Sequence, residues 1–268
     1  MGKRNWYSIR AEGAGPAVIY LYGPIGYDWW TDSGTSAKEF ARELDALGNR
    51  DVELRVNSEG GDVFEGYAIY SAIKRYAGRV TAFVDGLAAS AASYLILAAD
   101  EVVMGEASCL FIHQAWTMTV GNADELRATA EQLDVLDEQI VGIYAAHSNR
   151  DEEEIRATLK ATKMFSAAEA VEWGLASRID SGLKAAASIT RAAAKHLFAD
   201  EVPDGIEVVD EVEAPASDAP VIIDETPDEA PVAEVDGQEP VAEVEPQERP
   251  AARVVALRGR AQKFDTKG

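Results

Sequence analysis

Three features of the sequence suit chemistry that creates an oxyanion, and they follow one another along the chain. Gly60 and Gly61 form a turn, Ser90 lies where an apolar helix should begin, and His113 follows an apolar run. Paired glycines let a backbone N–H group face an incoming carbonyl with no side chain in the way. A serine at a helix start has unbonded N–H groups and the positive end of the helix dipole as neighbours, which suits a nucleophile.

Each feature also has a purely structural interpretation. A glycine pair is commonly only a turn, and Ser90 and Ser93 fit an alanine-rich core helix as small polar residues. Of the three histidines, His147 lies in a polar turn and His196 near the tail, whereas His113 is flanked by Phe111-Ile112 and by Gln114-Ala115-Trp116. The order strand–Gly-Gly–helix, strand–Ser–helix, strand–His is more specific than any one of its parts.

The elements that must position these residues alternate between strand and helix. Alternating or β-branched runs predict strands at residues 17–22, 51–56, 79–84, 101–104 and 109–112. A capping box of Ser36 and Glu39 opens one predicted helix, and further helices are expected at residues 63–76 and after Ser90. This order predicts an α/β fold, built from repeated strand–helix units around one core.

A long helix is predicted at residues 123–146. Leu126, Leu133 and Ile140 repeat at a seven-residue spacing, opposite an acidic face. At roughly 1.5 Å per residue such a helix is about 35 Å long, so it should project from a small domain or pack on another subunit. Shorter helices are expected after residues 151–154 and after a second capping box at residues 166–169.

Composition divides the chain into four predicted parts: an N-terminal segment (1–16), a folded domain (17–180), an amphipathic linker helix (181–199) and an acidic tail with a basic end (200–268). The formal net charge is −22, of which residues 200–250 contribute −17, while residues 251–268 carry +4. The tail has too few apolar side chains to offset its chain entropy, so it is expected to be disordered. The acidic balance argues against nucleic-acid binding.

The cysteine count and the absence of targeting signals predict a soluble cytoplasmic protein. Cys109 is the single cysteine, which excludes an intrachain disulfide and fits a reducing compartment. The start of the chain lacks the apolar region of a signal peptide, and the near-apolar run 86–99 is too short to span a bilayer. One cysteine and three scattered histidines offer no zinc cluster, and no P-loop is present, so no cofactor is expected.

Four motifs, in one order along the chain, resemble a known family. They are N-S-E-G-G (57–61), G-L-A-A-S-A-A-S-Y (86–94), F-I-H-Q-A-W (111–116) and F-S-A-A-E-A-V-E-W-G-L-A (165–176). Together they are similar to the Clp-type serine proteases, and more to the phage-encoded Clp-like head-maturation (prohead) proteases than to the bacterial housekeeping enzyme. The resemblance implies a ββα-spiral (ClpP/crotonase-like) fold. It also implies a serine endopeptidase that processes capsid or scaffold protein in the host cytoplasm.

The resemblance implies a role for each matching residue. Ser90 would be the nucleophile, His113 the general base, and the backbone N–H groups of Gly61 and Ala91 the oxyanion hole. The helix at residues 123–146 resembles the family's handle, which packs rings face to face, so a ring homo-oligomer is expected.

The third member of the triad is left open by the sequence. The family's acid position falls on Thr162, which can accept a hydrogen bond but cannot supply the negative charge that stabilises an imidazolium. Asp180 or Glu169 could replace that acid, although Glu169 already belongs to a capping box. A serine–histidine dyad is a further alternative.

Other interpretations compete with the protease. An inactive assembly protein on the same fold is favoured by Thr162 and opposed by the intact Ser90 and His113. A crotonase-type acyl-CoA enzyme would share the fold without needing a serine paired with a histidine. A Ser-Lys peptidase would use Lys74 or Lys163 as its base.

Overall fold

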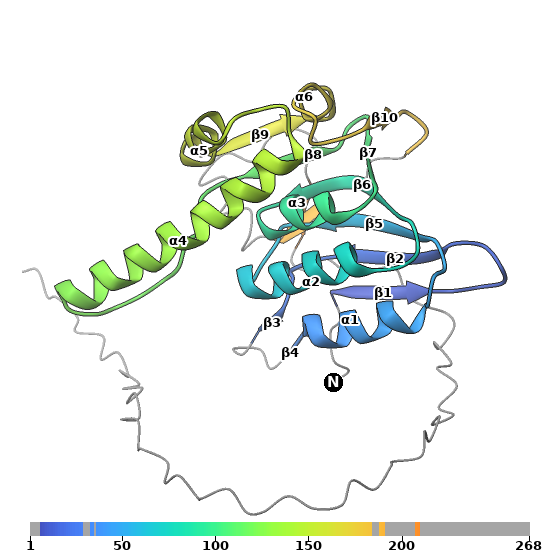
Figure 1. Cartoon of the computed structure of the whole chain (residues 1–268), viewed down its shortest axis with the longest axis horizontal. Helices are drawn as coiled ribbons and strands as arrows, with labels where there is room; N and C mark the ends of the chain where they lie inside the picture. Colours follow the sequence, from blue (N-terminus) through green and yellow to red (C-terminus); the bar gives the residue numbers. More distant parts are fainter. Residues whose placement is uncertain (1–5, 29–32, 35, 184–187, 191–206, 210–268) are drawn as a thin grey trace, which may run out of the picture. The chain divides into compact units, whose positions relative to one another are not determined.

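A computed structural model describes residues 6–28, 33–34, 36–183, 188–190 and 207–209 (Figure 1). The strands are β1 (Tyr7–Arg10), β2 (Ala17–Tyr22), β3 (Tyr27–Asp28), β4 (Ser33–Gly34), β5 (Val52–Ser58), β6 (Val80–Ala89), β7 (Glu101–Gly105), β8 (Cys109–Ile112), β9 (Lys163–Ser166), β10 (Arg178–Asp180), β11 (Ser188–Thr190) and β12 (Glu207–Val209). The helices are α1 (Ala37–Ala46), α2 (Val63–Arg75), α3 (Ala91–Leu95), α4 (Ala123–His147), α5 (Glu152–Ala161) and α6 (Ala167–Glu172), with one 3-10 turn, η1 (Ile96–Ala98).

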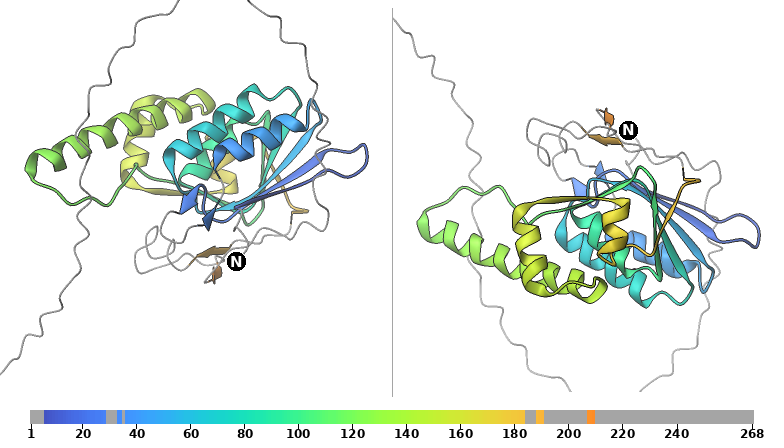
Figure 2. Two further views of the ribbon diagram at one scale, coloured as in Figure 1. Left: turned by 90° about the horizontal axis from the view of Figure 1, so that it is seen from below. Right: turned by 90° about the horizontal axis from the view of Figure 1, so that it is seen from above.

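One sheet of eight strands organises the domain. Its main path runs β1-β2-β5-β6-β7-β10, and β8 and β9 continue from β6. The strands of the path from β2 to β10 are parallel, whereas β1 is an antiparallel edge strand. Helices α1 and α2 lie side by side against one face of this sheet, as both views of Figure 2 show. The predicted α/β class is therefore confirmed, as a mixed α/β fold.

The core lies between the sheet and these helices. Register places Ile19, Leu54 and Ala82 side by side across β2, β5 and β6, and each is at most 1% exposed. Phe40 of α1 and Ile69 of α2 belong to the same cluster and are fully buried. Full burial of a large apolar side chain stabilises the fold by about 1.5–3 kcal/mol, so this layer fixes the sheet that carries the site.

Strand β6 is the central element because it changes partners along its length. Its first half pairs with β5 and β7, and residues 87–89 pair with β8. The register with β5 shifts between Val56 and Ser58, where the Asn57 side chain accepts a hydrogen bond from the Leu87 N–H (3.1 Å). The predicted end of this strand at residue 84 is wrong. Pairing with β8 continues it to Ala89, since non-local hydrogen bonds override weak local preference.

The sheet extends before residue 17, where the folded domain was predicted to begin. Strand β1 pairs with β2, and Trp6, Tyr7 and Ile9 are buried in the core, so the folded domain begins before Ala17. At the other end of the domain, β10 closes the sheet at Asp180, next to β7.

Beyond the sheet, the linker and tail predictions fall mostly outside the described residues. Three residues of the helix expected within 181–199 form strand β11 instead, paired in parallel with β12. Ile189 and Thr190 are β-branched, which favours a strand over a helical turn. Residues 181–183 form a turn instead of a helix, whereas residues 184–187 and 191–199, and the tail 200–268 apart from β12, lie outside the described residues.

Helix α4 matches the predicted long helix to within one residue at its end. Its second half packs on the domain through Asp137, Ile140, Val141 and Tyr144, which are all buried. Its first half has no buried residue. No helix in the described ranges combines the length and apolar character needed to cross a membrane.

Candidate active site

Ser90 occupies a sharp turn between β6 and α3. Its backbone has φ 51° and ψ −124°, a conformation that costs a non-glycine residue energy and is held only by its surroundings. One such restraint is the Ser90 N–H, which donates to the Phe111 carbonyl oxygen at 2.8 Å. Strand β6 leads into this strained serine and helix α3 leads away from it. The hydroxyl therefore lies at the tip of the turn, as in a nucleophile elbow.

Helix α3 fixes the turn from the other side, since all five of its residues are buried. The Ser93 hydroxyl donates to the Ser90 carbonyl oxygen (2.6 Å) and lies 2.6 Å from the Tyr144 hydroxyl on α4. Because the single Ser93 proton goes to Ser90, Tyr144 must donate to Ser93. Tyr94 donates to the Val63 carbonyl of α2 at 3.0 Å. Ser93 is therefore a structural residue that anchors the elbow.

The Gly60–Gly61 turn lies directly against this elbow. Gly60 has φ +88°, and a Cβ atom there would lie 2.5 Å from the Ala89 oxygen and 2.7 Å from both the Ala91 nitrogen and the Ser90 Cβ. The sequence therefore needs glycine at position 60 for two reasons, its backbone conformation and the close approach of the next strand.

The direction of the Gly61 N–H follows from the bridge between Gly61 and Ile25. Gly60 accepts from the Ile25 N–H (2.7 Å) and the Asp62 N–H donates to Ile25 (3.1 Å). In such a parallel bridge the N–H of the middle residue points to the opposite side, here away from β2 and toward β6. The Gly61 N–H therefore points to the side of the turn on which Ser90 and Ala91, the first residue of α3, lie against Gly60.

His113 follows β8 immediately and so lies at the strand end next to Ser90, because Ala89 pairs with Phe111. Its Nδ1 lies 2.7 Å from the Gln114 carbonyl oxygen. A carbonyl can only accept a hydrogen bond, so Nδ1 carries the proton and Nε2 is the acceptor nitrogen of the neutral ring. That tautomer is the one a general base needs in order to take a proton from serine.

Thr162 immediately precedes β9, which pairs with β8, the strand before His113. The last pair in this antiparallel register joins Ile112 to Lys163, so His113 and Thr162 each lie one residue beyond that pair. Thr162 is exposed and has φ 55°, which is rare for a β-branched residue. The position expected to hold an acid therefore lies one residue beyond the end of the β8–β9 pairing, as His113 does, and carries no carboxylate.

The two alternative acids are engaged elsewhere. Glu169 accepts from the Ser166 N–H (3.0 Å) and pairs with Lys163 (3.1 Å), and these contacts lower the pKa of its carboxyl group. Asp180 ends β10, where it pairs with Arg178 at 3.6 Å and accepts from the Gly182 N–H at 2.9 Å.

The remaining candidate bases also have structural contacts. Lys163 forms the ion pair with Glu169, and Lys74 lies over the Tyr70 ring on α2. His147 Nδ1 lies 2.9 Å from the Ile143 carbonyl oxygen, one turn earlier in α4. His196 lies outside the described residues.

Sequence reasoning missed a buried carboxylate near His113. Asp137 of α4 accepts hydrogen bonds from the Gln114 side-chain amide and from the Ala115 N–H, both at 2.7 Å. The available signal was its position: Asp137 falls on the same helix face as Leu133, Ile140 and Tyr144, where an acid needs a buried partner.

A second buried carboxylate ties together the strands that lead to the elbow. Asp85 of β6 is 2% exposed, accepts from Arg55 Nε and Tyr22 Oη at 2.9 Å each, and forms an ion pair with the Arg55 guanidinium. Burial raises the pKa of Asp85, and Arg55 offsets part of that rise. The three residues come from β6, β5 and β2, so they fix the three strands relative to one another.

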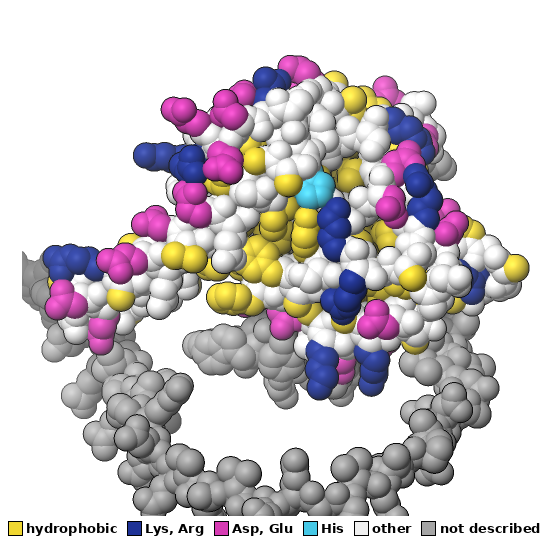
Figure 3. All heavy atoms as spheres, in the orientation of Figure 1, with side chains coloured by type: hydrophobic (Ala, Val, Ile, Leu, Met, Phe, Trp, Pro, Cys, Tyr) yellow, Lys and Arg dark blue, Asp and Glu magenta, His cyan; other side chains and the backbone are white. Residues whose placement is uncertain are grey.

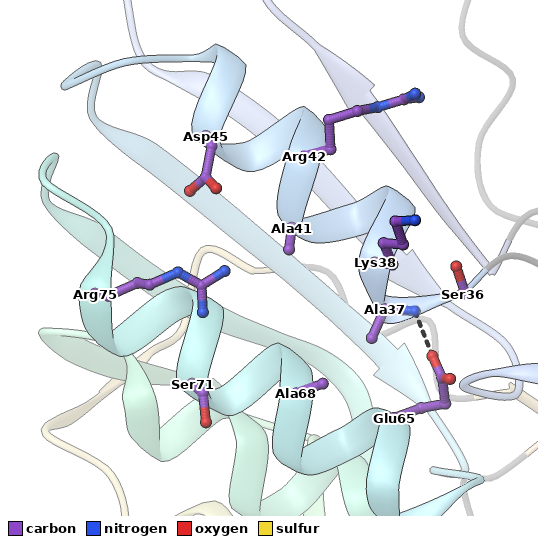
Figure 4. A pocket seen from close by; sticks show the side chains of 10 residues that line it. All are labelled: Ser36, Ala37, Lys38, Ala41, Arg42, Asp45, Glu65, Ala68, Ser71 and Arg75. Atoms are coloured by element: carbon purple, nitrogen blue, oxygen red, sulfur yellow. Dashed lines mark hydrogen bonds between the residues drawn. The ribbon is translucent and has the colours of Figure 1, made fainter. Parts of the chain in front are cut away.

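A groove of about 680 Å³ lies away from these residues, between α1 and α2. Figure 4 shows Asp45 and Arg75 facing each other from opposite helices, while Glu65 accepts a hydrogen bond from the Ala37 N–H and so caps α1. None of the candidate catalytic residues lines this groove.

The fold and the site define a class: a mixed α/β protein with a serine elbow, a glycine turn and a histidine at the neighbouring strand end. The family model described as Clp protease matches residues 20–181, which is more than half of the chain. The chain therefore belongs to the Clp protease family.

A curated relative shows the same similarity. The chain is 30% identical over 131 residues to the ATP-dependent Clp protease proteolytic subunit of Bacteroides thetaiotaomicron. The matched region covers 47% of this chain and 58% of that protein, so the chain spans less than two thirds of the relative's length.

Proposed function

We propose that the protein is a serine endopeptidase in which Ser90 attacks a peptide carbonyl. His113 accepts the serine proton through Nε2 and returns it to the leaving amine, while the N–H groups of Gly61 and Ala91 stabilise the oxyanion. The observation that carries the proposal is the strained Ser90 elbow in direct contact with the Gly60–Gly61 turn. Family membership supports the same chemistry.

A fluorophosphonate probe, which reacts with activated serines, tests the proposal. We expect labelling of the wild type, none of Ser90→Ala and a strong reduction in His113→Ala. Ser71→Ala is the matched control, because Ser71 is exposed on α2 and its hydroxyl donates to the Tyr67 carbonyl within that helix. Undiminished labelling of Ser90→Ala would contradict the assignment. An unlabelled wild type would favour the second candidate function, an inactive assembly protein, which the missing acid at Thr162 supports.

Capsid or scaffold protein in phage head maturation is the substrate class we infer. The four motifs support this inference, because they resemble those of the phage-encoded enzymes. Co-expression with the capsid and scaffold proteins of the same genome tests it, with mass spectrometry of the products. We expect cleavage by the wild type and none by Ser90→Ala. This substrate class would be ruled out if the probe labels the enzyme but the capsid and scaffold proteins stay intact.

We infer that the partner is further copies of this chain, which assemble into a ring through α4. The first half of the helix leaves Leu126 and Val135 44% and 58% exposed, and hydrophobic side chains reach the surface along α4 in Figure 3. An isolated helical segment of this length gains little stability from its own hydrogen bonds, so a packing partner would stabilise it. Sedimentation of Leu126→Glu should show smaller species than the wild type or Asp134→Asn, and unchanged assembly would exclude this surface.

A further inference from the structure

We propose that Asp137 is a positioning residue for His113, acting through the single peptide group that joins Gln114 to Ala115. This inference rests on the proposed function, because it assigns His113 as the base. It supplies, from α4, the negative charge that Thr162 cannot provide.

The hydrogen bonds form a continuous chain through that peptide group. His113 Nδ1 donates to the Gln114 carbonyl oxygen (2.7 Å), and the N–H of the same peptide unit, on Ala115, donates to Asp137 Oδ1 (2.7 Å). Asp137 Oδ2 accepts from the Gln114 side-chain amide, also at 2.7 Å. A carboxylate bonded to the N–H end of a peptide polarises its carbonyl end, so the oxygen that faces the imidazole becomes a stronger acceptor.

Packing holds the carboxylate rigidly. Asp137 is 9% exposed and lies beside the buried Ile140 and Val141, while the Tyr67 hydroxyl of α2 donates to the Leu136 carbonyl at 3.1 Å. A carboxylate that is this buried requires hydrogen bonds to both oxygens, and the Gln114–Ala115 segment supplies them. The acid therefore fixes the backbone next to His113, and that backbone in turn satisfies the hydrogen-bonding needs of both carboxyl oxygens.

The charged groups that flank Asp137 in the described part of the chain are exposed or paired with other residues. On α4 itself, Asp134 is exposed and Glu138 pairs with Arg156 of α5 at 2.7 Å. On the β9 side, Lys163 pairs with Glu169 of α6. From α2, Tyr67 faces Asp137, and burial together with the Asp137 charge raises the pKa of Tyr67 to about 12, so this hydroxyl stays neutral.

Asp137→Asn tests the charge while keeping the shape. The amide oxygen can still accept from Ala115, and its NH₂ can donate to a flipped Gln114 side chain. We expect kcat/KM for a peptide substrate to fall by about 10- to 100-fold with KM nearly unchanged, less than the roughly 10⁴-fold loss when an acid in direct contact is neutralised. Asp134→Asn, one turn earlier and exposed, is the matched control and should match the wild type.

The pH profile separates positioning from a purely structural role. A nearby negative charge favours the imidazolium, so its removal should move the acidic limb of the kcat/KM profile to lower pH. NMR titration of His113 in the Ser90→Ala background should show the same downward shift in pKa when Asp137→Asn is added. The proposal would be overturned if Asp137→Asn lowered the free energy of unfolding but changed neither the acidic limb of the kcat/KM profile nor the pKa of His113.

If the proposed function itself were wrong, the experiments would give a different set of results. In that case the probe does not distinguish wild type from Ser90→Ala, yet the His113 titration and the hydrogen exchange of the Ala115 amide still report on Asp137. Faster Ala115 exchange in Asp137→Ala, with the His113 pKa lowered, would support the hydrogen-bonded chain even in an inactive protein. Unchanged Ala115 exchange would exclude it.

Discussion

The two sides of the candidate active site are built differently. The Ser90 side is held by backbone geometry and packing: a strained turn, a glycine contact and a fully buried α3. The His113 side depends on hydrogen bonds to polar groups, and Thr162 there is exposed at the end of α5. Geometry made by the backbone tolerates few substitutions. A charge can instead be supplied from another element, as Asp137 on α4 illustrates.

The largest effect is expected from Gly60→Ala, which tests the packed side of the site, formed by the Ser90 turn, the Gly60 contact and α3. The added Cβ would lie 2.5–2.7 Å from backbone atoms of Ala89 and Ala91, which cannot move without displacing Ser90. A displacement of about 1 Å costs about 100-fold in rate, so fluorophosphonate labelling should slow by at least that factor. Gly142→Ala on α4 is the control, because nothing lies within 4 Å of its added Cβ. Normal labelling of Gly60→Ala would show that the elbow does not depend on this contact.

A smaller effect, in the opposite direction, is expected from Thr162→Asp on the polar side. An acid beside His113 would stabilise the imidazolium, and we expect kcat/KM to rise by about tenfold. Asp also tolerates a positive φ better than a β-branched residue does, so the fold should not suffer. Thr162→Asn is the matched control, with the same shape and no charge. Equal rates for the two variants would mean that charge at this position is not limiting.

The smallest effect concerns stability against pH. The pKa of Glu169 is lowered by the Ser166 N–H and by Lys163, so its contribution is complete above the ordinary carboxyl pKa of about 4.3. It is lost as pH falls through the lowered value, because the unfolded state then binds the proton more readily. Glu169→Gln should therefore cost up to about 1 kcal/mol near neutral pH and less near pH 3, measured by urea unfolding.

A packed-side variant provides the control for that experiment. Tyr144→Phe removes the hydrogen bond to Ser93, at a cost of about 1 kcal/mol. No carboxylate takes part in that bond, so its cost should be the same at both pH values. If the loss in free energy of unfolding depended on pH for Tyr144→Phe, or did not depend on pH for Glu169→Gln, the distinction between the Ser90 side and the His113 side would be lost.

Local patterns predicted the elements that the sequence encodes locally. The capping boxes at Ser36 and Ser166 and the long helix α4 are confirmed, because the residues that form them are neighbours in the chain. The order of glycine pair, serine and histidine also predicted which strand ends carry the candidate site. The catalytic roles of these residues stay predictions.

Features that depend on distant pairing were not predictable. The extension of β6 to Ala89 requires β8, and the position of Thr162 requires β9, which has no clear strand pattern of its own. Asp137 looked like one more acid on a charged helix. Only the packing of α4 against the domain shows that it is buried and bonded to Gln114 and Ala115.

The change of partner along β6 has a consequence for how the protein opens. Strand β8 is joined to β6 by only three residue pairs, whereas the helices α1 and α2 cover the long parallel part of the sheet. Segments with few pairings open at lower free energy than the global unfolding transition. The β8–β9 ribbon should therefore separate first, taking His113 away from Ser90 while the main sheet stays intact. Amide hydrogens of β8 and β9 should accordingly exchange before those of β2 and β5.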